Sequence, residues 1–172
     1  MVDFKTLRDM VDFKTLRDNY IKQWHELEFH PAFETFVAPG SVKGYGVYDK
    51  ISNTFPRNIK RFEIYVEPVG YDFKKIVKPD VYNHTEKILY SYQFSCSIKV
   101  VDNSNGNVVT QLMPQYTNES TATRNKITET YFILGIDIDT PFSAGEYTMT
   151  CVVTDLASRE TFDIIKDIRM VD

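Results

Sequence analysis

The order of apolar and polar positions divides the chain into one helical segment followed by a series of strands. From residue 13 to residue 28 apolar residues recur at the spacing of a helix face, and Pro31 prevents the helix from continuing. Beyond Pro39 the spacing changes to the alternation of half-buried strands. The apolar stripe of the helix consists of Phe13, Leu16, Tyr20, Trp24 and Leu27.

Seven segments have a strand pattern. The clearest runs from Tyr90 to Val100, where apolar residues occupy every second position. Asn105-Gly106 predicts a hairpin turn after it. The polar, mixed stretch 71–87 is expected to be a loop. The predicted strands are 42–48, 61–67, 90–100, 108–116, 127–138, 145–154 and 161–170.

About seven strands separated by turns predict a mainly β protein, an antiparallel immunoglobulin-like β-sandwich with an N-terminal α-helix. An open barrel is the alternative. No crossover helices are predicted between the strands, which excludes a doubly wound α/β fold. We therefore expect an N-terminal helix within residues 1–30 and a sandwich domain over residues 31–172.

The first eighteen residues contain one sequence twice. Residues 1–9 and residues 10–18 both read MVDFKTLRD. Nine residues turn a helix by about half a circle, so the two copies direct their apolar residues to opposite faces. Only the second copy is in register with the helix stripe. This predicts that residues 1–9 are a duplication and that Met10 is the more natural start; the alternative is a longer helix with two apolar faces.

The net charge of the chain argues against a nucleic-acid partner, and the length of its apolar runs argues against a membrane-spanning helix. The 172 residues carry a net charge of -4, so no basic excess is available to neutralise the phosphates of a nucleic acid. The longest apolar runs are far shorter than the roughly 20 residues of a membrane-spanning helix. We expect no nucleic-acid partner and no transmembrane segment. The N-terminus lacks the apolar segment of a signal peptide, which by itself supports a cytosolic domain with reduced cysteines.

The two cysteines occupy apolar-face positions of predicted strands. Cys96 lies on the third strand and Cys151 on the sixth, which are neighbours within one sheet of an immunoglobulin-like fold. Facing neighbours can form a disulfide if their geometry is right. The other interpretation is a pair of small buried thiols.

Candidate chemistry is sparse. Asp137, Asp139 and Glu146 could supply oxygen ligands to calcium at a sandwich edge, whereas a solvated turn explains the same residues more simply. His25 and His30 are five residues apart, so they lack the spacing of a helical zinc pair. The chain contains no GxSxG, SxxK, HExxH or glycine-rich phosphate loop. We predict no catalytic residues, no cofactor and no enzyme activity.

Several segments resemble a known group of proteins. The motifs GYGVY at residues 44–48, IYVEPVGY at residues 64–71 and GEYT at residues 145–148 are similar to those of predicted secreted prokaryotic proteins with an immunoglobulin-like β-sandwich. That group has no assigned activity. The resemblance implies a sandwich fold and a location outside the cytoplasm, either secreted or tethered to the surface.

These observations predict a non-catalytic binding or structural module. Recognition would use the loops 52–60, 72–87 and 118–126, a sheet edge, or outward tyrosines such as Tyr65 and Tyr131. More commonly, such tyrosines serve cross-strand packing or lie under a covering segment. The helix stripe could also dock a protein partner or a second copy of the chain. The alternative is a calcium-dependent protein or enzyme that uses the acidic loop.

Overall fold

The structure, a computed structural model, describes residues 13–80 and 82–172, so the duplicated segment 1–9 lies outside the described residues. The described part is mainly β, with ten strands and one helix, α2 (Phe13–His25). The strands are β1 (His30–Val37), β2 (Thr54–Pro56), β3 (Arg61–Val69), β4 (Lys74–Asp80), β5 (Thr85–Ser91), β6 (Phe94–Asp102), β7 (Val108–Tyr116), β8 (Phe132–Asp137), β9 (Gly145–Asp155) and β10 (Thr161–Val171).

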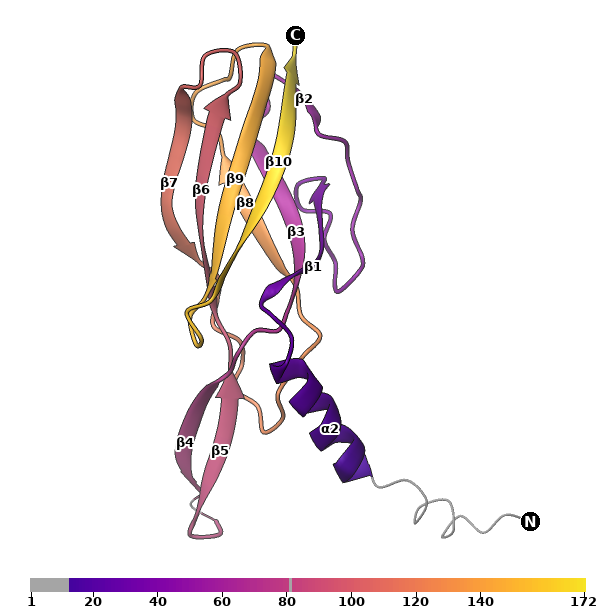
Figure 1. The fold of residues 1–172 in the computed structure, drawn as a ribbon, viewed down its shortest axis with the longest axis vertical. Helices are drawn as coiled ribbons and strands as arrows, with labels where there is room; N and C mark the ends of the chain where they lie inside the picture. Colours follow the sequence, from indigo (N-terminus) through magenta and orange to yellow (C-terminus); the bar gives the residue numbers. More distant parts are fainter. Residues whose placement is uncertain (1–12, 81) are drawn as a thin grey trace, which may run out of the picture.

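Eight of these strands form two sheets that face each other across one core (Figure 1). The three-stranded sheet has the order β1-β3-β8 and is antiparallel. The five-stranded sheet has the order β2-β10-β9-β6-β7; its short edge strand β2 runs parallel to β10 and the other pairs are antiparallel. The remaining two strands, β4 and β5, pair only with each other.

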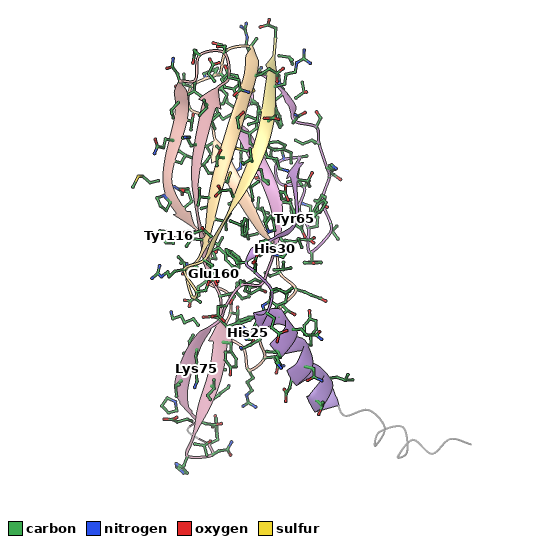
Figure 2. All side chains as sticks on the ribbon, viewed as in Figure 1. His25, His30, Tyr65, Lys75, Tyr116 and Glu160 are labelled. Carbon is green, nitrogen blue, oxygen red and sulfur yellow. The ribbon has the colours of Figure 1, made fainter. Side chains whose placement is uncertain are left out.

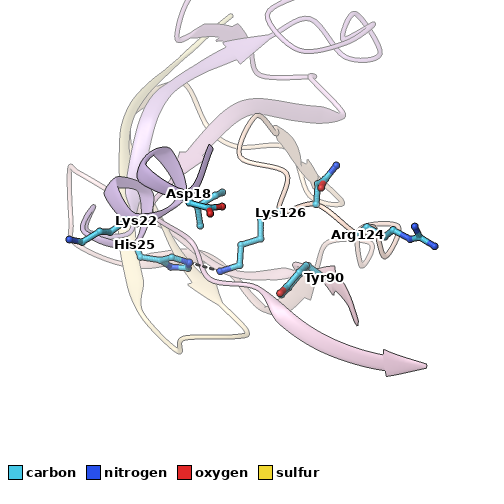
Figure 3. A pocket seen from close by; sticks show the side chains of 8 residues that line it. Asp18, Lys22, His25, Tyr90, Arg124 and Lys126 are labelled. Carbon is cyan, nitrogen blue, oxygen red and sulfur yellow. Dashed lines mark hydrogen bonds between the residues drawn. The ribbon is translucent and has the colours of Figure 1, made fainter. Parts of the chain in front are cut away.

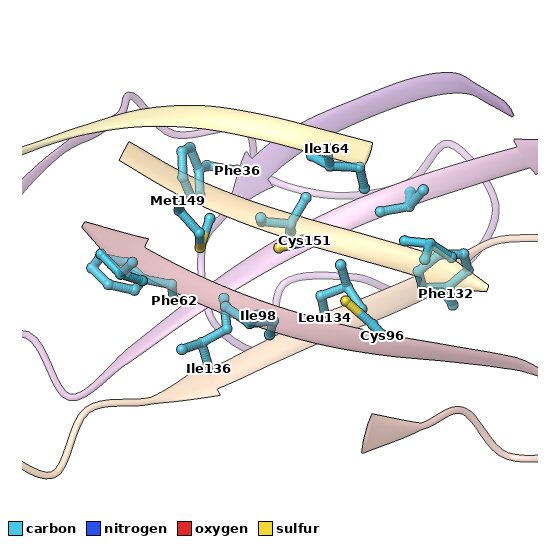
Figure 4. Packing of buried hydrophobic residues seen from close by; sticks show 14 of the residues in the cluster. Phe36, Phe62, Cys96, Ile98, Phe132, Leu134, Ile136, Met149, Cys151 and Ile164 are labelled. Atoms are coloured by element: carbon cyan, nitrogen blue, oxygen red, sulfur yellow. The ribbon is translucent and has the colours of Figure 1, made fainter. Parts of the chain in front are cut away.

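The core forms where the inward residues of the two sheets meet (Figure 4). Alternate residues of β9, from Tyr147 to Val153, are buried on one side. Phe62 and Ile64 of β3 and Leu134 of β8 are buried opposite them. Each such side chain contributes about 1.5–3 kcal/mol of burial free energy. The apolar alternation in the sequence therefore specifies which face of each strand points inward.

The strand count differs from the seven predicted. β1 was not predicted because Pro31 suggested a break, but β1 is an edge strand, where a proline costs no ladder hydrogen bond. The predicted strand 42–48 is wrong: this segment is a loop with a single bridge between Gly44 and Val47. Gly46 has a positive φ of 68°, which bends the chain away from a strand path.

This loop explains why Tyr65 does not face solvent. Tyr65 lies on the outer face of β3 but is 0% exposed, because Tyr48 and Tyr131 pack against its ring. Its hydroxyl accepts a hydrogen bond from Gly46 N at 2.7 Å and donates one to Glu67. The outward position of Tyr65 was predicted correctly, and of the two interpretations made from the sequence the more common one applies: Tyr65 lies under a covering segment.

The predicted loop 71–87 is instead the start of a hairpin that projects from the sandwich. We call β4, β5 and their connection the arm (residues 74–91). The predicted strand 90–100 is divided at Tyr92-Gln93, where the chain passes from the arm into β6. The predicted helix 13–28 ends at His25, and the predicted strand 127–138 begins only at Phe132. The arm and α2 extend from the same end of the sandwich (Figure 1).

The remaining strands follow the prediction closely. β7 has the predicted bounds, and β9 and β10 are each within one residue of theirs. The turn between β6 and β7 is closed by Gly106 N, which donates to the Asp102 carbonyl, and Gly106 has a φ of 74°. Asn-Gly at a turn requiring a positive φ is the strongest local signal for a hairpin.

Candidate functional site

Tyr71 joins α2, the sandwich and the loop before β8. Its side chain is fully buried, and the Trp24 ring packs edge-on against it with centroids 5.0 Å apart. Trp24 Nε1 donates to the Tyr71 carbonyl at 3.0 Å, and the Tyr71 hydroxyl donates to the Ile127 carbonyl at 2.6 Å. Burial raises the pKa of the Tyr71 phenol above its ordinary value. One residue therefore holds three segments together.

Gly70 permits the chain after α2 to pass close to the end of β3. Its φ is +72°, and a Cβ at this position would lie 2.3 Å from the Glu28 carbonyl oxygen. Only glycine combines this backbone conformation with so close an approach. The path of the chain from α2 to β1 therefore requires that residue 70 has no side chain.

The root of the arm is fixed to the sandwich by two carboxylates. Asp155, fully buried in the β9–β10 turn, accepts a hydrogen bond from Asp72 N at 2.7 Å. Glu119 accepts from Ser91 Oγ at 2.9 Å and from Lys74 Nζ at 3.1 Å. The Ser91 hydroxyl and the Lys74 ammonium lower the pKa of Glu119. These contacts hold both strands of the arm where they leave the sandwich.

Beyond its root, the arm presents apolar side chains to solvent (Figure 2). Val77 and Ile88 form a cross-strand pair and are 50% and 41% exposed. Tyr82 near the tip is 91% exposed. At the tip, Asp80 accepts hydrogen bonds from Tyr82 N and from Asn83 Nδ2, which lower the pKa of its carboxyl. The tip is ordered by local hydrogen bonds while its aromatic ring remains uncovered.

A cavity of about 490 Å³ lies between α2, the root of β5 and residues 124–126 (Figure 3). We call it the junction cavity. The Lys126 ammonium donates to Nε2 of His25, and the side chains of Lys22 and Arg124 point outward on either side, away from this pair. The residues that line it are Asp18, Ile21, Lys22, His25, Tyr90, Arg124, Asn125 and Lys126.

Two of the three predicted calcium ligands, Asp137 and Glu146, are bound by arginines at the opposite end of the sandwich. The Arg61 guanidinium donates to Asp137 at 2.7 Å and to Glu63 at 2.8 Å, and these two hydrogen bonds raise the pKa of Arg61. Glu146 pairs with Arg169 at 3.4 Å, and Asp139 is exposed. Over residues 13–80 and 82–172, no three His, Cys, Asp or Glu residues are grouped so that they could hold a metal ion.

The two cysteines are both buried and free, on neighbouring strands (Figure 4). In the β6–β9 ladder Cys96 opposes Val153 and Cys151 opposes Ile98, so the thiols are diagonal neighbours. A hydrogen bond with the Cys96 thiol, together with burial, raises the pKa of Cys151. As free thiols they behave as small apolar groups of the core.

No model of a known protein family matches this chain, and no curated protein is significantly similar to it. In the described part of the chain, no helix is both long enough and apolar enough to cross a membrane.

Sequence reasoning located only part of this end of the molecule. The loop 118–126 was predicted as a recognition loop, and it supplies Arg124 and Lys126 to the junction cavity. Lys22 and Tyr90 were not predicted as site residues. His25 and Lys126, which meet in the cavity, are 101 positions apart in the chain, so no local pattern connects them.

Proposed function

We propose that this protein is a non-catalytic binding or structural module that acts outside the cytoplasm, with the end formed by α2 and the arm as its contact surface. One observation carries the proposal. Within the apolar stripe of α2, Trp24 is buried against Tyr71, while Leu16 and Tyr20 are 57% and 50% exposed. Uncovered apolar stripes of amphipathic helices pack against other helices.

The strand order supports an immunoglobulin-like assignment of the sandwich. In that fold strands A, B and E share one sheet, and C, F and G share the other. β1, β3 and β8 correspond to A, B and E, whereas β6, β9 and β10 correspond to C, F and G. The arm is then an insertion between B and C.

A hydrogen bond at one corner of the sandwich adds to this assignment. Tyr147, near the start of β9, donates its hydroxyl proton to the Ser143 carbonyl at 2.9 Å. Immunoglobulin-like domains carry such a tyrosine at the corner between strands E and F. A location outside the cytoplasm rests on the resemblance of the 44–48, 64–71 and 145–148 motifs to secreted sandwich proteins.

The occupant of the helix stripe is a second copy of the chain. The uncovered part of the stripe, from Leu16 to Tyr20, spans about one turn, and two such short stripes bury each other most simply when two copies pair. The exposed residues Val77, Tyr82 and Ile88 of each arm would remain available to further contacts.

Light scattering across a concentration series tests this proposal. We expect the full chain to have the mass of a dimer and the Leu16→Glu/Tyr20→Glu variant to have the mass of a monomer. Asn19→Glu/Gln23→Glu is the matched control, because both residues are exposed on the same helix and the charge change is identical. A full chain that stays monomeric throughout, or a control that dissociates as readily as the stripe variant, would refute pairing through α2.

A further inference from the structure

The uncovered stripe of α2 is too small to hold two copies together by itself. Leu16 and Tyr20 together expose on the order of 200 Å² of side chain. A specific interface buries about 800 Å² of each partner. A dimer that pairs through α2 must therefore bury further surface, and the simplest source is surface that continues directly from the stripe.

Tyr20 is the residue at which the stripe meets the sandwich. Its hydroxyl accepts a hydrogen bond from Thr128 Oγ1 at 3.3 Å, in the segment that leads to β8. Burial, the carboxylates of Glu67 and Glu129 and the phenol of Tyr20 all raise the pKa of Tyr45, so Tyr20 lies close to the loop that crosses over β3. The stripe therefore reaches the outer face of the three-stranded sheet.

Four apolar side chains on this face, each between 37% and 56% exposed, are grouped around the buried ring of Tyr65. Ile133 is the cross-strand neighbour of Tyr65, and the N–H of Gly46 donates to the Tyr65 hydroxyl. Phe33 stacks on Tyr48, whose ring centroid lies 4.4 Å from that of Tyr65. We call this group the side patch; its members are Phe33, Tyr45, Val47 and Ile133.

We infer that the side patch is the second half of a self-association surface, and that the interface between two copies continues from the α2 stripe over the outer face of the three-stranded sheet. This inference rests on the proposed pairing through α2. Stripe and side patch together expose on the order of 500 Å² of apolar surface, and a polar rim supplies the remainder of a specific interface. Contiguous apolar areas of this size mark interaction sites.

Light scattering across a concentration series tests this inference with the Val47→Glu/Ile133→Glu variant of the full chain. We expect the dissociation constant of the dimer to rise at least tenfold, because the new carboxylates would be buried in the interface without partners. Val108→Glu/Val109→Glu is the matched control: these residues are 50% and 40% exposed on β7, at the edge of the other sheet. This control should dimerise as the parent does.

Ile133 belongs to β8, so Val47→Glu alone, in a loop, tests the side patch without altering a strand. Hydrogen exchange gives a second measurement: the amides of residues 44–48 should exchange more slowly in the dimer than in the monomer, and those of β7 should not. A dimer that Leu16→Glu/Tyr20→Glu dissociates but Val47→Glu/Ile133→Glu does not would overturn this inference alone. A parent that stays monomeric throughout would overturn the pairing through α2 as well.

Discussion

The carboxylate of Asp155 accepts a hydrogen bond from the backbone N–H of Asp72, 83 positions earlier in the chain, at 2.7 Å. Asp155 also accepts from Ala157 N, Ser158 N and Ser158 Oγ of its own turn. One buried carboxylate therefore closes the β9–β10 turn and fixes the start of the arm.

Replacement of Asp155 by Ala should lower the free energy of unfolding by about 3 kcal/mol, because several buried donors lose a charged acceptor. Chemical denaturation measures this change. Asp102→Ala is the control: Asp102 accepts comparable bonds in the exposed β6–β7 turn but reaches no distant segment. We expect a much smaller loss from it, and equal losses would contradict the role given to the Asp72 contact.

Gly70→Ala should destabilise the protein by about 2–4 kcal/mol, because the methyl group meets the Glu28 carbonyl at a positive φ. A substitution at Gly46 separates the cost of a positive φ from the cost of a steric clash. Gly46 has a similar φ of +68°, but nothing lies within 4 Å of an added Cβ. Gly46→Ala should therefore cost only about 1 kcal/mol. If thermal melts give the two variants the same loss, the close passage of residues 27–28 is not what requires glycine.

At alkaline pH the protein should unfold in the same pH range in which its buried tyrosines lose their protons. Burial raises the pKa of both Tyr65 and Tyr71, so the folded state retains their protons more strongly than the unfolded state. Their contribution to stability is complete below the unfolded pKa of about 10 and is lost as pH rises above it.

Near-ultraviolet absorbance of tyrosinate and circular dichroism, recorded together, measure this behaviour. We expect the last tyrosines to ionise in the same pH range in which the β signal disappears. Tyr82→Phe, at a position 91% exposed, is the control and should leave the pH at which the β signal disappears unchanged. Complete ionisation of all tyrosines while the fold persists would show that Tyr65 and Tyr71 are accessible.

The thiols of Cys96 and Cys151 should resist modification in the native protein. Both are buried, and the pKa of Cys151 is raised, so little reactive thiolate exists even in mildly alkaline solution. Ellman's reagent should modify neither thiol until guanidinium is added, and then both. Fast reaction of the folded protein, or a non-reduced mass lower by two hydrogens, would instead indicate accessible thiols or the alternative disulfide.

The sequence predicted those elements whose two faces differ. β9 and β10 were found because apolar residues alternate along them and clear turn residues separate them, whereas β7, which is mostly exposed, was found as the hairpin partner that Asn105-Gly106 predicts. The arm was missed since most of both faces of β4 and the first half of β5 are exposed, so no buried face leaves an alternating pattern. The burial of Tyr65 depends on Gly46 and Tyr48 in a loop that crosses over β3, a relationship that periodicity cannot reveal.

The site was less predictable than the fold. Arg124 and Lys126 were included in a recognition loop, but their partners on α2 and β5 become neighbours only when Tyr71 brings the segments together. Two of the three acidic residues predicted as calcium ligands, Asp137 and Glu146, are held by Arg61 and Arg169, which lie on other strands.

The contact between Trp24 and Tyr71 also gives the protein an intrinsic optical reporter. Trp24 is the only tryptophan in the chain and is 5% exposed, at the point where helix, arm and sandwich meet. Selectively excited emission therefore comes from this junction and from no other part of the molecule. The wavelength or intensity of this emission would change if a ligand bound beside α2, if a partner displaced the helix or if the arm loosened. No added label is needed to observe it.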